Sequence, residues 1–193
     1  MLPSRAYLPH ARPLEDAFEI IRREASRIPL AEYDDWPQRA GYVGTWKVYG
    51  LFSADDGRVT LGETCAAHAT RCPGTLAALA RLPGVVRAAF SVLLPGTHIQ
   101  PHVDGGDELR CHLGLSIPER CGLRVAGEVL RWREGRCLVF DGRDEHEAAN
   151  LDVTPRTVLV VGVRRDGWPL QGPRNGSSAG SDGSSLLGRR ATA

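Results

Sequence analysis

The chain has 193 residues, five cysteines and a formal net charge of +1, which suits one folded domain with a core of its own. A net charge near zero gives no general attraction to polyanions, so we expect no nucleic-acid partner and no membrane partner. No stretch of sequence approaches the roughly 20 apolar residues of a membrane span. The odd cysteine count and the lack of a recognisable signal peptide lead us to expect a cytoplasmic location.

The N-terminal part of the domain, about residues 13–82, is expected to be mostly helical. Residues 1–12 look irregular. Apolar residues recur on one side of residues 14–28 with charged residues opposite, which predicts an amphipathic helix. A loop with several aromatic residues is expected over 29–44, and residues 45–52 have the composition of a strand.

Residues 53–72 are expected to form a long polar connection, with a turn at 55–57. Residues 73–82 predict a short helix, because proline is favoured at the first helical position and a Pro-Gly pair follows the last. A disulfide between Cys65 and Cys72 is an open alternative, which a reducing cytoplasm disfavours.

From residue 85 the chain changes to short β-rich runs separated by Gly, Pro, Asp and Asn. Such spacing favours an antiparallel sandwich or barrel of the jelly-roll type, with a core over about residues 85–165. The Gly- and Ser-rich tail, 171–193, is expected to be disordered, which leaves one domain over 1–170. The expected strands are 86–94, 97–103, 109–117, 121–126, 128–133, 136–140, 144–149 and 156–164. The three cysteines in these runs are expected to be small core residues.

Two histidines and one carboxylate form the most informative pattern in the chain. His102 and Asp104 are two residues apart, so on a strand their side chains would share one face, and His146 could reach the same point from a later strand. Two His and one carboxylate on one face of a metal are the ligands of non-haem Fe(II) oxygenases. His98 would lie on the same strand face, but roughly 13 Å away, too far to share the metal.

Around this pattern the chain resembles the aspartyl/asparaginyl β-hydroxylase family of Fe(II)- and 2-oxoglutarate-dependent dioxygenases. The likeness covers about residues 13–165. It is strongest in three blocks, 90–102, 109–118 and 132–141, the last running on into 145–147. The resemblance implies a mainly β protein, with a cupin-like double-stranded β-helix core preceded by N-terminal helices. It also implies hydroxylation of a C–H bond with Fe(II), 2-oxoglutarate and O2.

The resemblance assigns His102, Asp104 and His146 as metal ligands. Asp104 is a departure, because the animal peptide hydroxylases of this family have glycine at that position, and the loop after it is one residue shorter here. The resemblance also gives Arg156 and Ser91 to the distal carboxylate of 2-oxoglutarate. A guanidinium at a strand end that faces into the barrel suits a bidentate carboxylate clamp. The ligands are set more firmly than the metal, so zinc remains an alternative to iron.

Arg110 and His112 share one face of an otherwise apolar strand, where unpaired polar groups would be costly to bury. By the resemblance, His112 lies beside the co-substrate. Arg110 is expected to bind a carboxylate of the substrate, with the metal-bound end of 2-oxoglutarate as the alternative. Trp46 is expected at the mouth of the site as a substrate contact, together with Lys47 and Tyr49, although core packing is an equal alternative for Trp46 and Tyr49.

Three functions follow from this pattern. We favour a hydroxylase acting on an amino acid that is free, peptidyl or carrier-bound, with Asp/Asn-type β-hydroxylation first. The same chemistry on a lipid or other small molecule is the second. A non-catalytic jelly-roll protein that binds a metal or ligand is the third.

Overall fold

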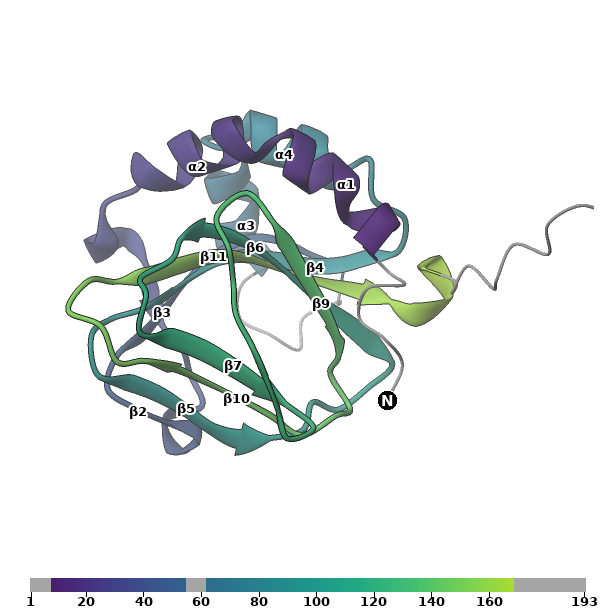
Figure 1. The fold of residues 1–193 in the computed structure, drawn as a ribbon. Coiled ribbons are helices and arrows are strands. Elements are labelled where there is room, and N and C mark those ends of the chain that lie inside the picture. The colour runs from purple at the N-terminus through teal and green to yellow at the C-terminus, as the bar shows by residue number, and fades with distance from the viewer. Residues whose placement is uncertain (1–7, 55–61, 169–193) are drawn as a thin grey trace, which may run out of the picture.

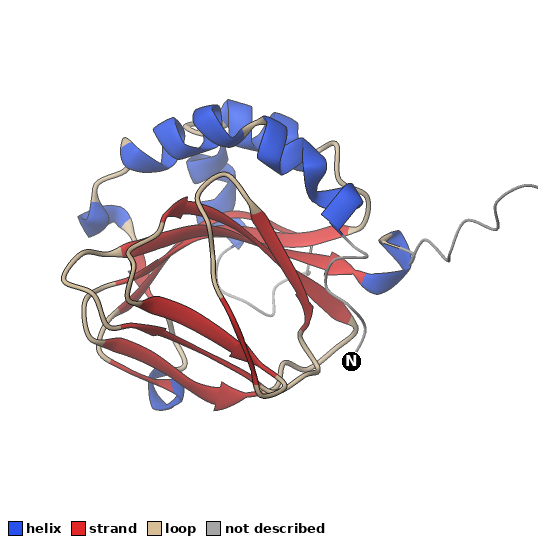
Figure 2. Ribbon diagram, viewed as in Figure 1, coloured by secondary structure: helices blue, strands red, loops and turns tan. Residues whose placement is uncertain are grey.

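The fold consists of two antiparallel sheets that face each other, with helices over the outer face of the larger sheet (Figures 1 and 2). The computed structural model describes residues 8–54 and 62–168. In order across it, the larger sheet contains β1 (Asp34–Asp35), β3 (Trp46–Ser53), β4 (Val85–Leu93), β11 (Arg156–Arg164), β6 (Glu108–Ser116) and β9 (Cys137–Asp141). The smaller sheet contains β2 (Tyr42–Val43), β5 (Thr97–His102), β10 (His146–Asn150), β7 (Cys121–Val125) and β8 (Glu128–Leu130).

Each of the eight expected β-rich runs contains a strand, and the two facing sheets confirm the mainly β jelly-roll expectation. The four α-helices of the described chain are α1 (Leu8–Asp16), α2 (Phe18–Ser26), α3 (Gly62–Ala69) and α4 (Pro73–Leu79). In Figure 1, α1, α2 and α4 lie over the larger sheet, on the side away from the smaller one.

The N-terminal prediction was wrong at two points. The chain is helical from Leu8, inside the stretch expected to be irregular, and the helix continues through Pro13. Its Ala11 and Leu14 are fully buried in the core beneath the helices, and this packing stabilises the helix. The single helix expected over 14–28 is two helices, since Ala17 interrupts it with φ −95° and ψ 9°.

The polar connection expected over 53–72 contains α3, whose alanines have the highest helix propensity. The turn predicted at 55–57 and the tail predicted to be disordered lie outside the described residues. Cys72 is a buried free thiol, so the alternative of a disulfide to Cys65 is not supported.

Alternating side chains in the larger sheet divide the interior into two cores. One face of β4, β6 and β11 packs against the helices through residues such as Phe90, Leu113 and Leu159. The opposite face looks toward the smaller sheet and contributes residues such as Leu93 and Val158 to a second core. Three strand cysteines lie in these cores as expected: Cys111, Cys121 and Cys137.

A β-bulge in β5 changes which residues of this strand face the smaller sheet's inner side. His146 pairs with His102, whereas Ala148 pairs with Ile99, so three residues of β5 span two of β10. The extra residue lies beside Pro101, and bulges are where proline is tolerated within a sheet. His102 therefore shares its face with Ile99 and not with His98, which corrects the expectation from simple alternation.

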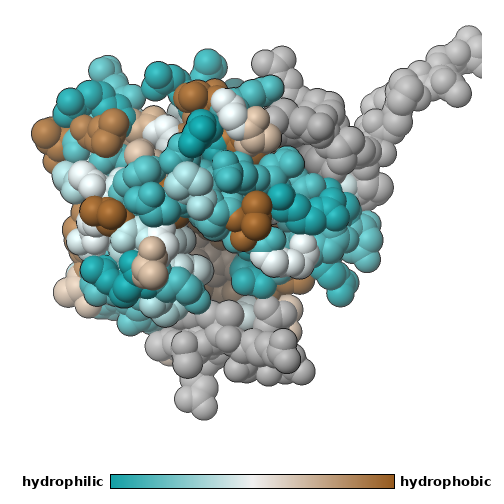
Figure 3. All heavy atoms as spheres, turned by 90° about the horizontal axis from the view of Figure 1, so that it is seen from below, coloured by the Kyte–Doolittle hydropathy of each residue, from teal (hydrophilic) through white to brown (hydrophobic). Residues whose placement is uncertain are grey.

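The outer surface seen from below is mostly hydrophilic, with hydrophobic residues in small separate groups (Figure 3). Within the described residues, no helix has both the length and the apolar composition needed to span a membrane.

Candidate active site

Two histidines and an aspartate meet where β5 and β10 lie side by side. His102 ends β5 and His146 begins β10, and their imidazole centroids are 4.2 Å apart. The Nε2 atoms of His102 and His146 lie 3.9 and 3.7 Å from the carboxylate of Asp104. Donors that share one first-row metal at about 2.1 Å each lie up to about 4.2 Å apart, so both separations fit a common ion.

In both imidazoles Nε2 is the nitrogen available to bind a metal. Nδ1 of His102 is 2.8 Å from the carbonyl oxygen of Gln100, and Nδ1 of His146 is 2.9 Å from that of Asp144. A carbonyl oxygen only accepts hydrogen bonds, so each Nδ1 carries the proton and each Nε2 has a free lone pair. Burial lowers the pKa of His146, which also favours the neutral ring.

The spacing predicted Asp104 on the same strand as His102. In the structure Asp104 lies in the loop after β5. Its backbone N–H donates to the carbonyl of Gly142 at 2.8 Å, which ties the loop to the β9–β10 connection. Its Oδ2 accepts a hydrogen bond from Nε of Arg110 at 2.6 Å. A side chain on Gly142 would meet Oδ2 at 3.1 Å, so this glycine leaves the carboxylate its space.

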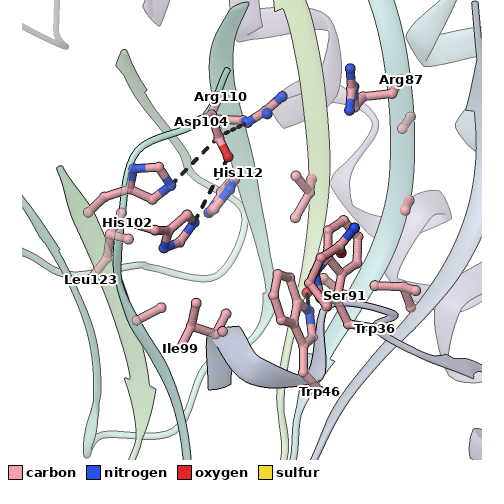
Figure 4. A pocket seen from close by; sticks show the side chains of 18 of the residues that line it. Trp36, Trp46, Arg87, Ser91, Ile99, His102, Asp104, Arg110, His112 and Leu123 are labelled. Atoms are coloured by element: carbon pink, nitrogen blue, oxygen red, sulfur yellow. Dashed lines mark hydrogen bonds and ion pairs between the residues drawn. The ribbon is translucent and has the colours of Figure 1, made fainter. Parts of the chain in front are cut away.

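The three residues line a cavity of about 440 Å³ between the two sheets. Figure 4 shows His102 and Asp104 on one side of it and Ser91 with Trp46 on the other. The cavity also contains Arg156, His112 and Arg110, so the structure brings together all eight site residues expected from the sequence: Trp46, Ser91, His102, Asp104, Arg110, His112, His146 and Arg156.

Arg156, the first residue of β11, is 2% exposed and has no carboxylate partner within the described part of the chain. Its guanidinium lies 4.7 Å from the centre of the Trp132 ring, its Nη1 donates weakly to the carbonyl of Ser91 at 3.5 Å, and its Nε has no partner. Burial lowers the pKa of Arg156 to about 9, so the group is still a cation at neutral pH. A buried, unpaired guanidinium in a cavity is a ready site for an anion.

The hydroxyl of Ser91 lies on the same cavity wall, and its own proton is available for a hydrogen bond to a ligand. It accepts a hydrogen bond from the indole N–H of Trp46 at 3.0 Å. Trp46 stacks on Trp36, with centroids 4.4 Å apart, and both rings line the cavity. Trp46 therefore belongs to the site and not only to the core.

His112 is a neutral hydrogen-bond donor. Its Nδ1 accepts from the indole N–H of Trp132 at 3.3 Å, so the ring proton lies on Nε2. Burial, with a further contribution from Arg156, lowers the pKa of His112 well below its usual value. Trp132 thus supports both His112 and Arg156 while remaining a core residue, as expected.

Lys47 was wrongly predicted at the mouth of the site, and for Tyr49 the alternative of core packing is confirmed. Tyr49 is fully buried on the helix-facing side, and Lys47 pairs with Asp35 at 3.0 Å. Lys47 and Tyr49 are one and three residues after Trp46 on β3, so their side chains point to the opposite face. Val48, two residues after Trp46, lines the cavity.

Sequence reasoning missed Trp36 as a cavity residue, and it assigned Trp132 to the core without its two contacts to the site. Neither is part of a local pattern: Trp36 lines the cavity from the connection between β1 and β2, and Trp132 contacts Arg156 and His112 from the connection between β8 and β9. His98 stays outside the cluster, as expected, and pairs with Glu147 at 2.8 Å.

A jelly roll whose cavity holds two histidines and a carboxylate defines a class, that of the β-barrel proteins with a two-histidine, one-carboxylate cluster. The family follows from comparison of the sequence. The chain belongs to the aspartyl/asparaginyl beta-hydroxylase family, whose family model matches residues 15–166.

Two curated relatives illustrate the range of the family. The chain is 32% identical over 180 residues to the ornithine lipid ester-linked acyl 2-hydroxylase of Rhizobium tropici, covering 87% of this chain and 60% of that protein. It is 33% identical over 154 residues to aspartate beta-hydroxylase domain-containing protein 2 of Xenopus tropicalis, covering 75% of this chain and 39% of that protein. The chain therefore spans less than two thirds of either relative.

Among solved structures, a prolyl-4-hydroxylase of Pseudomonas putida aligns with a TM-score of 0.48 and 18% identity, covering 83% of this chain and 89% of that one.

Proposed function

We propose that this protein is an Fe(II)- and 2-oxoglutarate-dependent dioxygenase that hydroxylates an aliphatic C–H bond. One observation carries the proposal: a metal-ready cluster of His102, Asp104 and His146 shares its cavity with the buried, unpaired cation of Arg156. The cluster supplies ligands of the types that Fe(II) takes, and the cation supplies a site for a dicarboxylate. Membership of a hydroxylase family supports the same reaction class.

Each residue has a role that its contacts support. His102, Asp104 and His146 would hold the iron, which when bound supplies the oxidation that couples O2 and 2-oxoglutarate to C–H hydroxylation, with succinate and CO2 as co-products. Arg156 would pair with the distal carboxylate of 2-oxoglutarate, and Ser91 would donate its free hydroxyl proton to the same group. Nε2–H of His112 would donate to the co-substrate.

Two substrate classes remain, and one observation separates them. An amino-acid substrate, such as an aspartyl or asparaginyl side chain, needs charged or amide partners. The cavity lining also includes apolar residues from both sheets: Val48, Phe52, Ala88, Ala89, Ile99, Leu123 and Ala148. This wall favours an alkyl or acyl chain as the second candidate, and one relative carries the name of an acyl 2-hydroxylase.

The test is Fe(II)-dependent formation of succinate from 2-oxoglutarate under air. The panel contains free amino acids, short Asp- and Asn-containing peptides, and acyl amides of increasing chain length. A product heavier by one oxygen atom would identify the substrate class. His102→Ala should abolish turnover, whereas Arg22→Gln, an exposed helix residue, should leave it unchanged. Absence of succinate with every substrate, and of 2-oxoglutarate binding to metal-loaded protein, would contradict the proposal.

A cytoplasmic location stays a prediction. The thiols of Cys72, Cys111, Cys121 and Cys137 are all free, which agrees with a reducing compartment.

A further inference from the structure

Behind the metal cluster lies a chain of charged side chains that spans three strands of the larger sheet. Gly162 of β11 pairs with Arg87 of β4 on one side and with Arg110 of β6 on the other. The carboxylate of Glu108 lies between the two arginines. It accepts from Nη2 of Arg87 at 2.6 Å and forms a short ion pair with Nη1 of Arg110.

The missing side chain of Gly162 makes this convergence possible. A Cβ atom there would meet Oε2 of Glu108 at 2.6 Å, Cγ of Arg87 at 2.7 Å and Nη1 of Arg110 at 2.9 Å. The first and third of these distances fall on the atoms of the Glu108–Arg110 ion pair. The central strand therefore leaves open the volume in which these charges meet.

The chain of charges ends on the carboxylate that faces the histidines. Nε of Arg110 donates to Oδ2 of Asp104 at 2.6 Å. The same Oδ2 lies 3.7 Å from Nε2 of His146, and Oδ1 lies 3.9 Å from Nε2 of His102. Arg110 is largely buried, with its side chain 12% exposed, and it is paired with two carboxylates. This pairing leaves little reason for Arg110 to attract a substrate carboxylate.

We propose that Arg110 is a positioning residue that acts through Asp104: its hydrogen bond to Oδ2 holds the carboxylate in the orientation that faces both imidazoles, and Arg110 is itself fixed by Glu108 and Arg87. The sequence had favoured a substrate-binding role for Arg110, and the two roles predict different effects on metal binding. The inference rests on the proposed metal ligation by Asp104.

The test is a double-mutant cycle on metal affinity, measured in the absence of any substrate. Co(II) is titrated into the metal-free protein and followed by its visible absorption. Arg110→Gln should weaken Co(II) binding by about 10- to 100-fold, the usual effect of losing a partner of a ligating residue. The Co(II) absorption spectrum should also change, because Arg110 no longer holds the carboxylate of Asp104 in one orientation. Arg22→Gln is the matched control for loss of one paired arginine and should change neither.

In the Asp104→Ala background the same Arg110→Gln change should weaken Co(II) binding no further, within about threefold. Unchanged or tighter Co(II) binding by Arg110→Gln with Asp104 intact would overturn the inference. So would an equal loss in both backgrounds, because a structural effect does not depend on Asp104. Wild-type protein that binds no Co(II) would overturn the proposed metal site along with it, whereas the earlier outcomes leave that site standing.

A second variant guards against misfolding of Arg110→Gln. Gly162→Ala keeps every charge but pushes a methyl group into the meeting point of Glu108 and Arg110. We expect it to weaken Co(II) binding in the same direction, with Asp104 again required. Gly122→Ala, where a Cβ atom meets nothing within 4 Å, is its matched control. Wild-type affinity in Gly162→Ala would contradict a role for the charge chain.

Discussion

Arg156 shows how a residue of the candidate site can lower the stability of the fold that contains it. Its cation is buried, and among residues 8–54 and 62–168 its contacts are the Trp132 ring and a long hydrogen bond to a carbonyl oxygen. Burying a charge without a partner is unfavourable. An anion bound in the cavity beside the guanidinium would supply the missing partner.

We expect Arg156→Met to stabilise the ligand-free protein by about 1–3 kcal/mol, because it removes an unpaired buried charge and keeps apolar volume against Trp132. The same change should abolish the stabilisation that 2-oxoglutarate gives to the metal-loaded wild type. Urea denaturation with and without 2-oxoglutarate measures both effects. A less stable ligand-free variant would show that the guanidinium is satisfied by the fold alone.

Gly142 sets the space beside Asp104. A Cβ atom there would lie 3.1 Å from Oδ2 and 3.2 Å from Cβ of Asp104, closer than side chains normally pack. Gly142→Ala should therefore shift the carboxylate by a few tenths of an ångström and weaken metal binding several-fold, with little change in unfolding free energy. Titration of the metal-free protein with Co(II) checks this, and full affinity in the variant would mean that the loop relaxes freely.

At the level of elements, α2 and α4 are joined by one buried carboxylate. Glu24 of α2 accepts from the backbone N–H groups of Gly74 and Thr75 at 2.8 Å each, and from the Thr75 hydroxyl at 2.6 Å. These are N–H groups of the first turn of α4, which have no partner within the helix. Glu24 therefore caps the N-terminus of α4 from a neighbouring helix.

Glu24→Gln should lower the free energy of unfolding by about 1–3 kcal/mol, because an amide cannot accept all three bonds and at least one buried donor loses its partner. Glu19→Gln, on the exposed side of the same helix, is the matched control and should change stability by less than about 0.5 kcal/mol. Urea denaturation midpoints of the two variants decide the matter; equal midpoints would rule out the capping role.

How far the sequence predicted these elements depends on the range of the interactions involved. The strands were predictable because alternation is local: Leu109, Cys111 and Leu113 turn toward the helices, while Arg110 and His112 turn toward the cavity. Of the site, the spacing of the motif predicted His102, Asp104 and His146, although Asp104 lies in the loop after β5, and the family resemblance predicted Ser91, His112 and Arg156.

Features that depend on another strand or on tertiary contact were missed. The bulge beside Pro101 follows from pairing with β10, and it reversed the expected orientation of His98. The break at Ala17 and the helix from Leu8 follow from how the N-terminal segment packs over the larger sheet. The space over Gly162 exists only once three strands lie together.

For the whole molecule, the site joins the two sheets. His102 and His146 belong to the smaller sheet, and Arg156, Ser91 and His112 belong to the larger one. A metal bound to the first pair and a co-substrate held by the second group would connect the two layers through the cavity.

We therefore expect Mn(II) and 2-oxoglutarate together to raise the melting temperature by more than the sum of their separate effects. Ligands at about 100 times their Kd contribute about 2.7 kcal/mol each when they bind independently. Calorimetric melting in the absence of Fe(II) measures this without turnover. Strictly additive shifts would mean that the co-substrate binds without contact to the metal. In Arg156→Met the excess should disappear.

The extra residue in β5 has a consequence for altering this strand. The extra residue lets Ile99 and His102 share the inner face although they are three positions apart in the sequence. Removing one residue at Gln100 or Pro101 would restore a regular ladder in which Ile99 and His102 are two positions apart and still share that face. Removing both residues would make Ile99 and His102 neighbours on opposite faces. We therefore expect a one-residue deletion in this segment to keep the imidazole in the cavity, and a two-residue deletion to turn it out.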